Sequence, residues 1–185
     1  MISFMPNPQK ADATRIRVLA HDEVERMAPV LADLLRESVN RGASLGFIPP
    51  LGRSKGLEYW LNLCPELRAG QRLLLVAHVR SRLIGAGQLA FPAWPNGQHR
   101  AEIQKLLVAT PYRGRGVGTA LMAALHQAAH QHGRTLILLG TRSGEPPERF
   151  YKGLGYQTAG VIPGYSTGPA GDRYDNTLLY RRSAD

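Results

Sequence analysis

The sequence has little cysteine and no long hydrophobic segment. Its one cysteine, Cys64, excludes a disulfide within the chain, which fits a reducing compartment. No stretch approaches the roughly 18 consecutive apolar residues of a membrane-spanning helix. Residues 1–13 form a short segment that is broken by proline and lacks the continuous hydrophobic region of a signal peptide. We therefore expect a cytoplasmic protein that does not contact the membrane.

The chain also has no block of like charge, although it is strongly basic. Its formal net charge is +9 and its pI is about 10.2. Such a charge attracts nucleic acids or a small polyanionic ligand. The Lys and Arg residues are spread from Arg15 to Arg182 without a run of five, and no segment combines clustered basic residues with aromatics. This pattern is typical of a solvated surface and does not favour nucleic-acid binding.

Length and periodicity predict one α/β domain. The 185 residues suit a flexible tail at 1–13 and a single domain at 14–182. Pro29 should kink or restart the first helix, and the apolar segment 134–141 predicts a strand buried on both faces. The expected strands are 14–20, 72–79, 82–91, 100–109, 134–141, 156–162 and 173–181. The expected helices are 22–40, 54–68, one that follows the glycine-rich string at 111–121 and ends near 131, and 146–155. This order predicts a mixed sheet with helices on both faces.

The most informative string is PYRGRGVGTAL, residues 111–121, which lies between a predicted strand and a predicted helix. Backbone N–H groups at a helix start lack partners and lie at the positive end of the helix dipole, so the position suits phosphate. Arg113 and Arg115 add positive charge. Three alternating glycines remove side chains and permit positive φ: Gly114, Gly116 and Gly118. The alternative is an ordinary strand-to-helix turn.

Two common phosphate motifs do not fit this string. The chain contains no P-loop sequence. The dinucleotide fingerprint Gly-x-Gly-x-x-Gly fails at Thr119, and Gly140 stands where its acidic residue would be expected. The pattern that fits is Arg-x-x-Gly-x-Gly, formed by Arg113, Gly116 and Gly118. It resembles the acetyl-CoA-binding motif of the GNAT superfamily of N-acetyltransferases.

The resemblance extends over residues 14–181. RFYKGLGY, residues 149–156, resembles the tyrosine-bearing segment before the last hairpin of the superfamily. The strings LLRESVNRGASLGF, NGQHRAEIQKLLV and IPGY are similar to the tabtoxin-resistance acetyltransferase group. The resemblance implies a GNAT-like mixed, mostly antiparallel sheet that is flanked by helices and splayed between its fourth and fifth strands. A homodimer is common in the family, and the sequence leaves the oligomeric state open.

The resemblance also implies acetyl-CoA as the acetyl donor and a set of residues that bind it. Pantetheine would pair with the backbone near Leu107 and Val108, in the gap between the strands that end at Val108 and Gly140. The full cofactor-binding set is Leu107, Val108, Arg113, Gly114, Arg115, Gly116, Val117, Gly118 and Thr119.

Transfer of an acetyl group to an amine requires a base, because a free alkyl amine has a pKa near 10 and must lose a proton to attack. Glu102 is the candidate base, since the superfamily often uses a glutamate at this place, directly or through water. Its even spacing from Val108 predicts that both lie on one face of the strand. The alternative is a carboxylate at the rim that pairs with Arg100 or Lys105.

Tyr151 is the candidate acid. A phenol keeps its proton near neutral pH, and Tyr151 matches the tyrosine that the superfamily places near the sulfur of CoA. The alternative is an aromatic ring packed beside Phe150. Tyr156 is expected in the core.

The acceptor amine is expected near Glu37, Phe47 and Tyr165. In the superfamily the turn between the first two helices borders the substrate, although residues 37–47 also suit a helix end followed by a loop. Tabtoxin-resistance-type sequences tend to carry an Asp where this chain has Gly140, so no role for that carboxylate is carried over.

No metal site is expected. His126 and His130 lie four residues apart on a predicted helix, but residue 127 is Gln127 rather than the Glu of a zinc motif, and no third ligand follows. The pair is expected on an exposed helix face.

The sequence therefore predicts an acetyl-CoA-dependent N-acetyltransferase. The resemblance implies a small-molecule amine as acceptor, such as that of a toxin or an antibiotic. Two alternatives stay open: an acceptor amine on a protein or peptide, and a non-catalytic acyl-CoA-binding module. The second would keep the glycine-rich turn and dispense with Glu102 and Tyr151.

Overall fold

The fold is built on one seven-stranded sheet. The computed structural model describes residues 13–182, so the expected tail lies outside the described residues except for Ala13. The strands are β1 (Arg15–Val18), β2 (Arg72–Val79), β3 (Arg82–Ala90), β4 (Arg100–Val108), β5 (Leu136–Arg142), β6 (Gln157–Thr167) and β7 (Arg173–Arg182). The helices are α1 (Val24–Asn40), α2 (Arg53–Leu61), α3 (Cys64–Arg68), α4 (Val117–Gln131) and α5 (Pro146–Gly153), with short 3-10 helices η2 (His21–Glu23), η3 (Pro95–Gly97) and η4 (Thr110–Tyr112).

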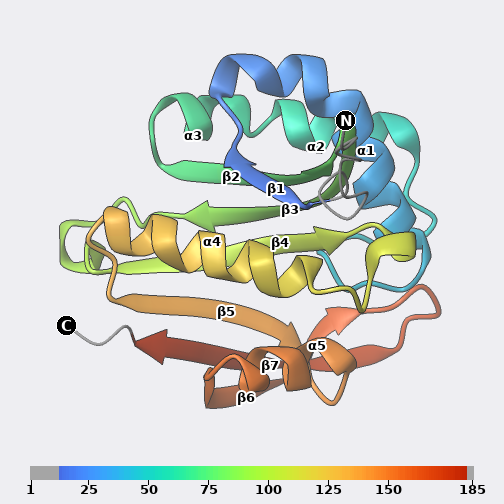
Figure 1. Cartoon of the computed structure of the whole chain (residues 1–185). Coiled ribbons are helices and arrows are strands. Elements are labelled where there is room, and N and C mark those ends of the chain that lie inside the picture. Colours follow the sequence, from blue (N-terminus) through green and yellow to red (C-terminus); the bar gives the residue numbers. More distant parts are fainter. Residues whose placement is uncertain (1–12, 183–185) are drawn as a thin grey trace, which may run out of the picture.

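The strand order is β1-β2-β3-β4-β5-β7-β6. All neighbouring strands are antiparallel except β4 and β5, which run parallel. Figure 1 shows α4 lying across β3 and β4, while α1, α2 and α3 lie together toward the β1 end of the sheet. The expected mixed, mostly antiparallel sheet with flanking helices is confirmed.

Two apolar clusters lie on the two faces of the sheet. On one face α1 and α2 pack over β2, β3 and β4; fully buried residues here include Leu31, Leu35, Trp60 and Leu74. On the other face α4 supplies Leu121, Met122 and Leu125, which pack with Ile84 and Leu89 of β3. Because each face buries its own cluster, the sheet is held rigidly between two helical layers.

Helix α1 presents one apolar stripe to the sheet. Its buried residues recur at the helical period, from Val24 through Ala28 and Leu31 to Leu35. The helix runs unbroken through Pro29, so the predicted restart at that residue is wrong. Burial of the stripe offsets the intrahelical hydrogen bond that Pro29 cannot donate.

Three other predicted elements differ from the structure. The helix predicted at 54–68 is two helices, α2 and α3, because Pro65 in the first turn of α3 has no N–H to continue the ladder. Strand β6 continues to Thr167, beyond its predicted end at 162. In β5 only Ile137 and Leu139 are buried, so the predicted burial on both faces is wrong. Helices α1 and α3 pack over β2 to β4, which leaves that face of β5 uncovered.

Among residues 13–182, no helix combines the length and the apolar character that crossing a membrane would require.

Candidate active site

Strands β4 and β5 pair at one end and then separate. Their parallel ladder joins Arg100–Glu102 to Leu136–Leu138, although β4 continues to Val108 and β5 to Arg142. Beyond this ladder the two facing strand edges present backbone N–H and C=O groups that another chain or a ligand can bind. The expected split between the fourth and fifth strands is confirmed.

A bulge interrupts β4 within this split. Gln88 of β3 pairs with Gln104 and Ala86 pairs with Leu107, so β4 contains one residue more than β3 between these pairs. Lys105 has a φ of +49°, in the left-handed region that non-glycine residues rarely adopt. The bulge therefore turns the Lys105 side chain out of the regular alternation.

The bulge also changes which residues of β4 share a face. Four residues pack against the cluster beneath α4: Ala101, Ile103, Leu106 and Val108. Odd-numbered residues face this cluster before the bulge, and even-numbered residues face it afterwards. The prediction that Glu102 shares a face with Val108 is therefore wrong, since Glu102 lies on the face covered by α1 and α2.

Glu102 occupies the point where the two strands begin to separate. It is exposed, and its Cα pairs with Ala90 of β3 and Leu138 of β5. Within the described chain Glu102 forms no ion pair, so the expected alternative of a bridge to Arg100 or Lys105 is not formed. An exposed, unpaired carboxylate at the end of the ladder is available to a ligand.

The start of α4 has the backbone that the glycine-rich string predicts. Gly114 and Gly116 have φ values of +70° and +81°, and a Cβ on either would meet nothing within 4 Å. Both glycines therefore serve the backbone conformation and leave open space beside the turn. Gly118 differs, because its Cβ would lie 3.5 Å from Phe150 Cζ, an ordinary van der Waals distance, so this position faces α5 rather than open space.

No side chain of the described residues caps α4 at its N-cap, Gly116. The N–H groups of the first turn of any helix lack intrahelical partners and lie at the positive end of the helix dipole. In α4 these groups are therefore available to a ligand. Arg113 Nε donates a hydrogen bond to the carbonyl oxygen of Val108 at 2.9 Å, which ties its guanidinium to the end of β4. Arg115 is exposed on the same turn. These features fit the pyrophosphate of a CoA-type ligand.

Tyr151 lies on α5 within an aromatic group. Its ring centroid is 5.3 Å from that of Phe150 and 6.0 Å from that of Tyr156. Desolvation raises the pKa of Tyr151 to about 12, so the phenol holds its proton at neutral pH. Tyr151 is thus a packed aromatic residue, and its hydroxyl stays protonated. Tyr156 is buried, as expected.

Asn176 fills the space beside Gly140. A Cβ on Gly140 would lie 2.8 Å from Asn176 Nδ2, closer than non-bonded atoms approach. Asn176 comes from β7, where it pairs with Arg142 and is 9% exposed. Sequence reasoning missed it because the register between β5 and β7 has no local signal in the sequence.

Glu37 connects α1 to the segment that precedes the glycine-rich turn. Its Oε1 accepts the backbone N–H of Thr110 at 3.1 Å. Burial alone would raise the pKa of Glu37, but hydrogen bonding from Thr110 and the charges of Arg41 and Arg113 outweigh it, so the pKa is lowered. The carboxylate therefore remains ionised while it holds the start of η4.

The three expected acceptor residues do not form one cluster. Phe47 packs edge-on against Tyr59 of α2, with ring centroids 5.4 Å apart. Tyr165 is 62% exposed on β6 and makes no described contact with Glu37 or Phe47. The residue that does approach Phe47 is Lys105, whose Nζ lies 6.0 Å from the Phe47 ring centroid and 5.6 Å from that of Tyr59.

A polar network that the sequence did not reveal supports this group. Arg72 donates to Gln88 at 2.9 Å and to Gln104 at 2.8 Å, and it pairs with Glu66 at 2.8 Å. The hydroxyl of Tyr59 hydrogen-bonds to the fully buried Gln88. Because the network joins β2, β3, β4 and α2, it fixes the ring of Tyr59 beside Lys105.

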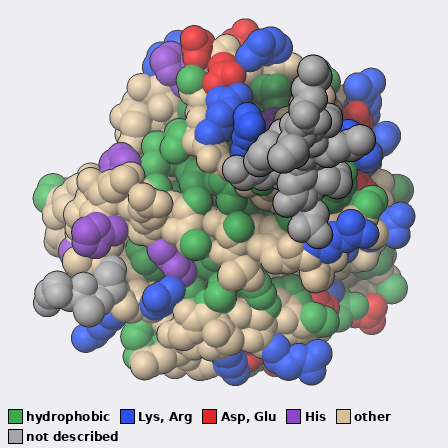
Figure 2. Space-filling view, viewed as in Figure 1, with side chains coloured by type: hydrophobic (Ala, Val, Ile, Leu, Met, Phe, Trp, Pro, Cys, Tyr) green, Lys and Arg blue, Asp and Glu red, His purple; other side chains and the backbone are tan. Residues whose placement is uncertain are grey.

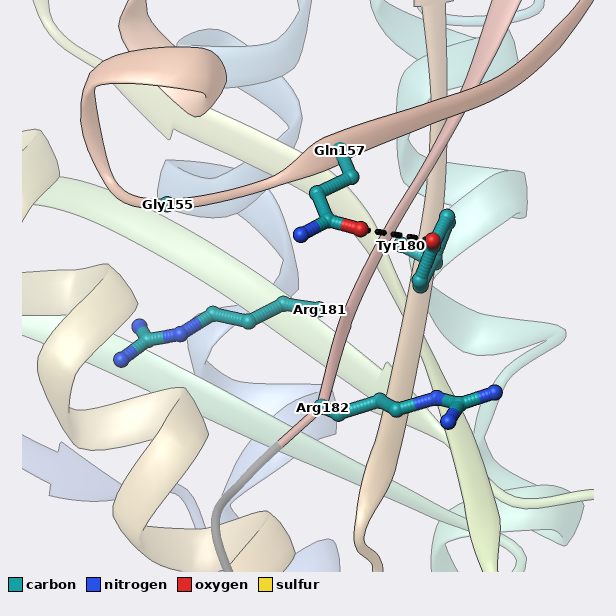
Figure 3. A pocket seen from close by; sticks show the side chains of 5 residues that line it. All are labelled: Gly155, Gln157, Tyr180, Arg181 and Arg182. Carbon is teal, nitrogen blue, oxygen red and sulfur yellow. Dashed lines mark hydrogen bonds between the residues drawn. The ribbon is translucent and has the colours of Figure 1, made fainter.

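A pocket of about 400 Å³ lies at a different place, between the start of β6 and the end of β7. Figure 3 shows that Gln157 and Tyr180 point toward each other there, while Arg181 and Arg182 extend to opposite sides of β7. Arg182 pairs with Leu136 at the start of β5. The pocket therefore lies at the end of β5 away from Gly140.

Arg181 leads from this pocket to His126 on α4. Arg181 Nη1 donates to His126 Nδ1 at 2.9 Å, so His126 Nε2 carries the proton and donates to the Tyr156 hydroxyl at 2.8 Å. Desolvation, with the charge of Arg181, lowers the pKa of His126 to about 4. His126 is half-buried, so its predicted exposure is wrong, whereas His130 is exposed.

Basic residues are distributed over the surface rather than joined. On the face shown in Figure 2, Lys and Arg side chains lie in separate groups around the rim. This face offers no continuous basic track of the kind that follows a nucleic-acid backbone.

The split between β4 and β5, beside the start of α4 at Gly116, is the arrangement of an acyl-CoA-binding fold. Residues 44–156 match the Acetyltransferase (GNAT) family, and the chain belongs to that family. The family uses acetyl-CoA as acetyl donor and acts on small-molecule or peptide amines.

Solved structures share the fold at low sequence identity. The ribosomal-protein-alanine N-acetyltransferase of Brucella melitensis is 20% identical, with 91% of this chain and 99% of that chain covered and a TM-score of 0.73. The yncA protein of Salmonella typhimurium, solved with its cofactor acetyl-CoA, is 15% identical, with 94% and 95% covered and a TM-score of 0.72. An N-acetyltransferase of Staphylococcus aureus Mu50 is 13% identical, with 92% and 98% covered and a TM-score of 0.74.

Proposed function

We propose that this chain is an acetyl-CoA-dependent N-acetyltransferase that moves an acetyl group to the amine of a small molecule by direct attack on the thioester. The observation that supports it best is the path between β4 and β5. It begins at the glycine-capped start of α4 and ends where the strands meet at Glu102. A nucleotide-bearing donor bound along this path brings its reactive end to a free carboxylate.

The residues that would bind the donor form two groups, one for the pyrophosphate and one for the pantetheine arm. First-turn N–H groups of Val117–Thr119, with Arg113 and Arg115, would hold the pyrophosphate. Backbone groups of Leu107 and Val108 would pair with the amides of the pantetheine arm, since that edge of β4 forms no ladder with β5. When bound, acetyl-CoA supplies an acetyl group activated as a thioester.

Glu102 and Tyr151 handle the two protons of the reaction. Glu102 takes one proton from the acceptor amine, directly or through water, so that the nitrogen lone pair can form the new N–C bond. As the C–S bond breaks, the protonated phenol of Tyr151 gives its proton to the leaving sulfur. The phenolate then regains a proton from solvent, and Glu102 releases one. The products are the N-acetylated acceptor and free thiol.

The acceptor is assigned to the α1 and α2 face of the sheet, where Glu102, Phe47 and Lys105 lie. The strings at 34–47, 96–108 and 162–165 that resemble the tabtoxin-resistance group support an amine of a toxin or antibiotic. A protein amine, as in the name of the Brucella melitensis structure, is the competing acceptor.

Glu102→Gln tests the proposal, with Glu58→Gln on the exposed side of α2 as matched control. Calorimetry measures acetyl-CoA binding, and thiol release measures turnover with a panel of amines. We expect acetyl-CoA affinity to be unchanged and kcat/KM to fall by about 100-fold or more, the usual contribution of a general base. An unchanged rate would remove Glu102 from this role. Failure of the wild type to bind acetyl-CoA would overturn the function itself.

A further inference from the structure

Lys105 is a cation beside the proposed acceptor site that forms no ion pair with the described residues. The residue is half-buried, and the positive φ at the bulge directs its ammonium between the rings of Phe47 and Tyr59. Within residues 13–182 it forms neither an ion pair nor a hydrogen bond. A partly desolvated ammonium that contacts two aromatic rings but no described carboxylate, carried on a strained backbone, retains the capacity to bind an anion. Such a group is typical of a site that acts on something outside the chain.

Two other basic side chains on this face have acidic partners. Strand pairing places Leu138, and hence Gly140 and Arg142, on the same face as Glu102. Arg142 pairs with Glu145 at 3.0 Å, and Arg72 pairs with Glu66 at 2.8 Å. Of these three cations, Lys105 is the one that forms no ion pair with a described residue.

The electrostatics of Lys105 agree with this geometry. Desolvation lowers its pKa, the charge of Arg72 lowers it further, and only Glu102 raises it. A ligand carboxylate at Nζ would stabilise the charged form, whereas a second ligand cation would be repelled. This arrangement disfavours polycationic amines such as polyamines and aminoglycosides.

Lys105 is also placed to act on the acceptor rather than on the donor. It follows Glu102 by three residues on β4. Its ammonium contacts the loop after α1, where a Cβ on Gly46 would lie 3.5 Å from Nζ. The glycine-capped turn that would hold the pyrophosphate lies beyond the other end of the bulge, after Val108.

We propose that Lys105 binds a carboxylate of the acceptor, so that the acetylated amine belongs to an amino-acid-like zwitterion. This inference rests on the proposed function, because it assigns the acceptor of the same site. A single ammonium between two apolar rings balances one negative charge, as a carboxylate carries. Lys105 sets specificity through binding, while Glu102 removes the amine proton.

The first test compares turnover of matched acceptors, each α-amino acid against its carboxamide, with acetyl-CoA as donor. The variants are Lys105→Gln, Lys105→Arg and, as a matched control, the exposed Lys55→Gln. We expect the wild type to prefer the carboxylate member by about tenfold or more, the effect of one charge-assisted hydrogen bond. Lys105→Gln should abolish this preference by raising KM at nearly unchanged kcat, while Lys105→Arg and Lys55→Gln should retain it.

The second test measures binding without turnover. Calorimetry in the presence of CoA compares N-acetyl amino acids with N-acetyl amino acid amides on the wild type and on Lys105→Gln. Tighter binding of the acids by the wild type alone supports the inference. The inference would be overturned if the wild type bound both series equally or bound neither. It would also be overturned if, in the first test, Lys105→Gln lowered kcat at unchanged KM.

Acetyl-CoA affinity and turnover of neutral amines are measured in the same samples. If both persist without any carboxylate preference, the inference fails and the proposed function stands. If acetyl-CoA does not bind, the proposed function fails, and the same calorimetry of the two N-acetyl series, repeated without CoA, still decides the role of Lys105.

Discussion

Replacement of Glu37 separates a structural role from the expected role in acceptor binding. Glu37→Ala removes the carboxylate that accepts the Thr110 N–H at 3.1 Å and leaves that partly buried amide without a partner. A hydrogen bond to a charged group contributes about 1.5–3 kcal/mol. The Glu37 side chain is 33% exposed, so we expect about 1–2 kcal/mol of lost stability after solvent screening. This corresponds to a decrease in Tm of about 2–8 °C for a chain of this size.

The assay pairs thermal unfolding with acetyl-CoA calorimetry and acceptor kinetics. Glu37→Gln keeps an acceptor oxygen and should lose about half as much stability, and the exposed Glu25→Ala on the same helix is the control. Because η4 leads into the glycine-rich turn, acetyl-CoA affinity should weaken with stability. The pKa of Glu37 is lowered in the fold, so its contribution is present at neutral pH and is lost as pH falls below the ordinary carboxyl range. A raised acceptor KM with unchanged Tm would refute this reasoning and support substrate contact.

Three further changes test other parts of the account. Tyr151→Phe should lower kcat far more than acetyl-CoA affinity, and an unchanged rate in the thiol-release assay would exclude the acid role. Gly140→Ala should lower the free energy of unfolding in urea by about 1–3 kcal/mol, because its Cβ would lie 2.8 Å from Asn176 Nδ2. The double variant Gly140→Ala with Asn176→Ala should recover much of this loss. If the destabilisations of the two single variants simply add in the double variant, the clash is contradicted. His126 has a pKa of about 4 in the fold and about 6.5 in the unfolded chain. The stability contributed by its neutral form is therefore complete above pH 6.5 and is lost as pH falls toward 4. His126→Gln should make the decline of stability with falling pH less steep, and a pH profile identical to that of the wild type would contradict this role of His126.

Much of the fold follows from local sequence patterns. The period of apolar residues located α1, α4 and the strands of the central sheet, because each buries one regular stripe or face. The glycine-rich string predicted the start of α4 well, since positive φ at Gly114 and Gly116 is a local requirement. The burial of β5 was predicted wrongly, because α1 and α3 pack over β2 to β4 and do not extend over β5.

The finer geometry of the candidate site depends on contacts between distant segments. The bulge at Lys105 arises from the register of β4 on β3, so no spacing within β4 predicts that Glu102 and Val108 face opposite sides. Asn176 reaches Gly140 only through the pairing of β5 with β7. The surroundings of Arg72 and Lys105 have no local signal in the sequence, because Glu66, Gln88 and Gln104 around Arg72 and the rings beside Lys105 come from other elements of the chain.

The central claim is tested most directly by following acetyl transfer itself. The wild type is incubated with acetyl-CoA and a panel of amines that includes the paired amino acids and amides, and free thiol and N-acetylated product are quantified in the same reaction. The account predicts one acetylated amine for each thiol released, and loss of both in Glu102→Gln. Thiol release without an acetylated amine, or no acetyl-CoA binding by the wild type, would contradict it.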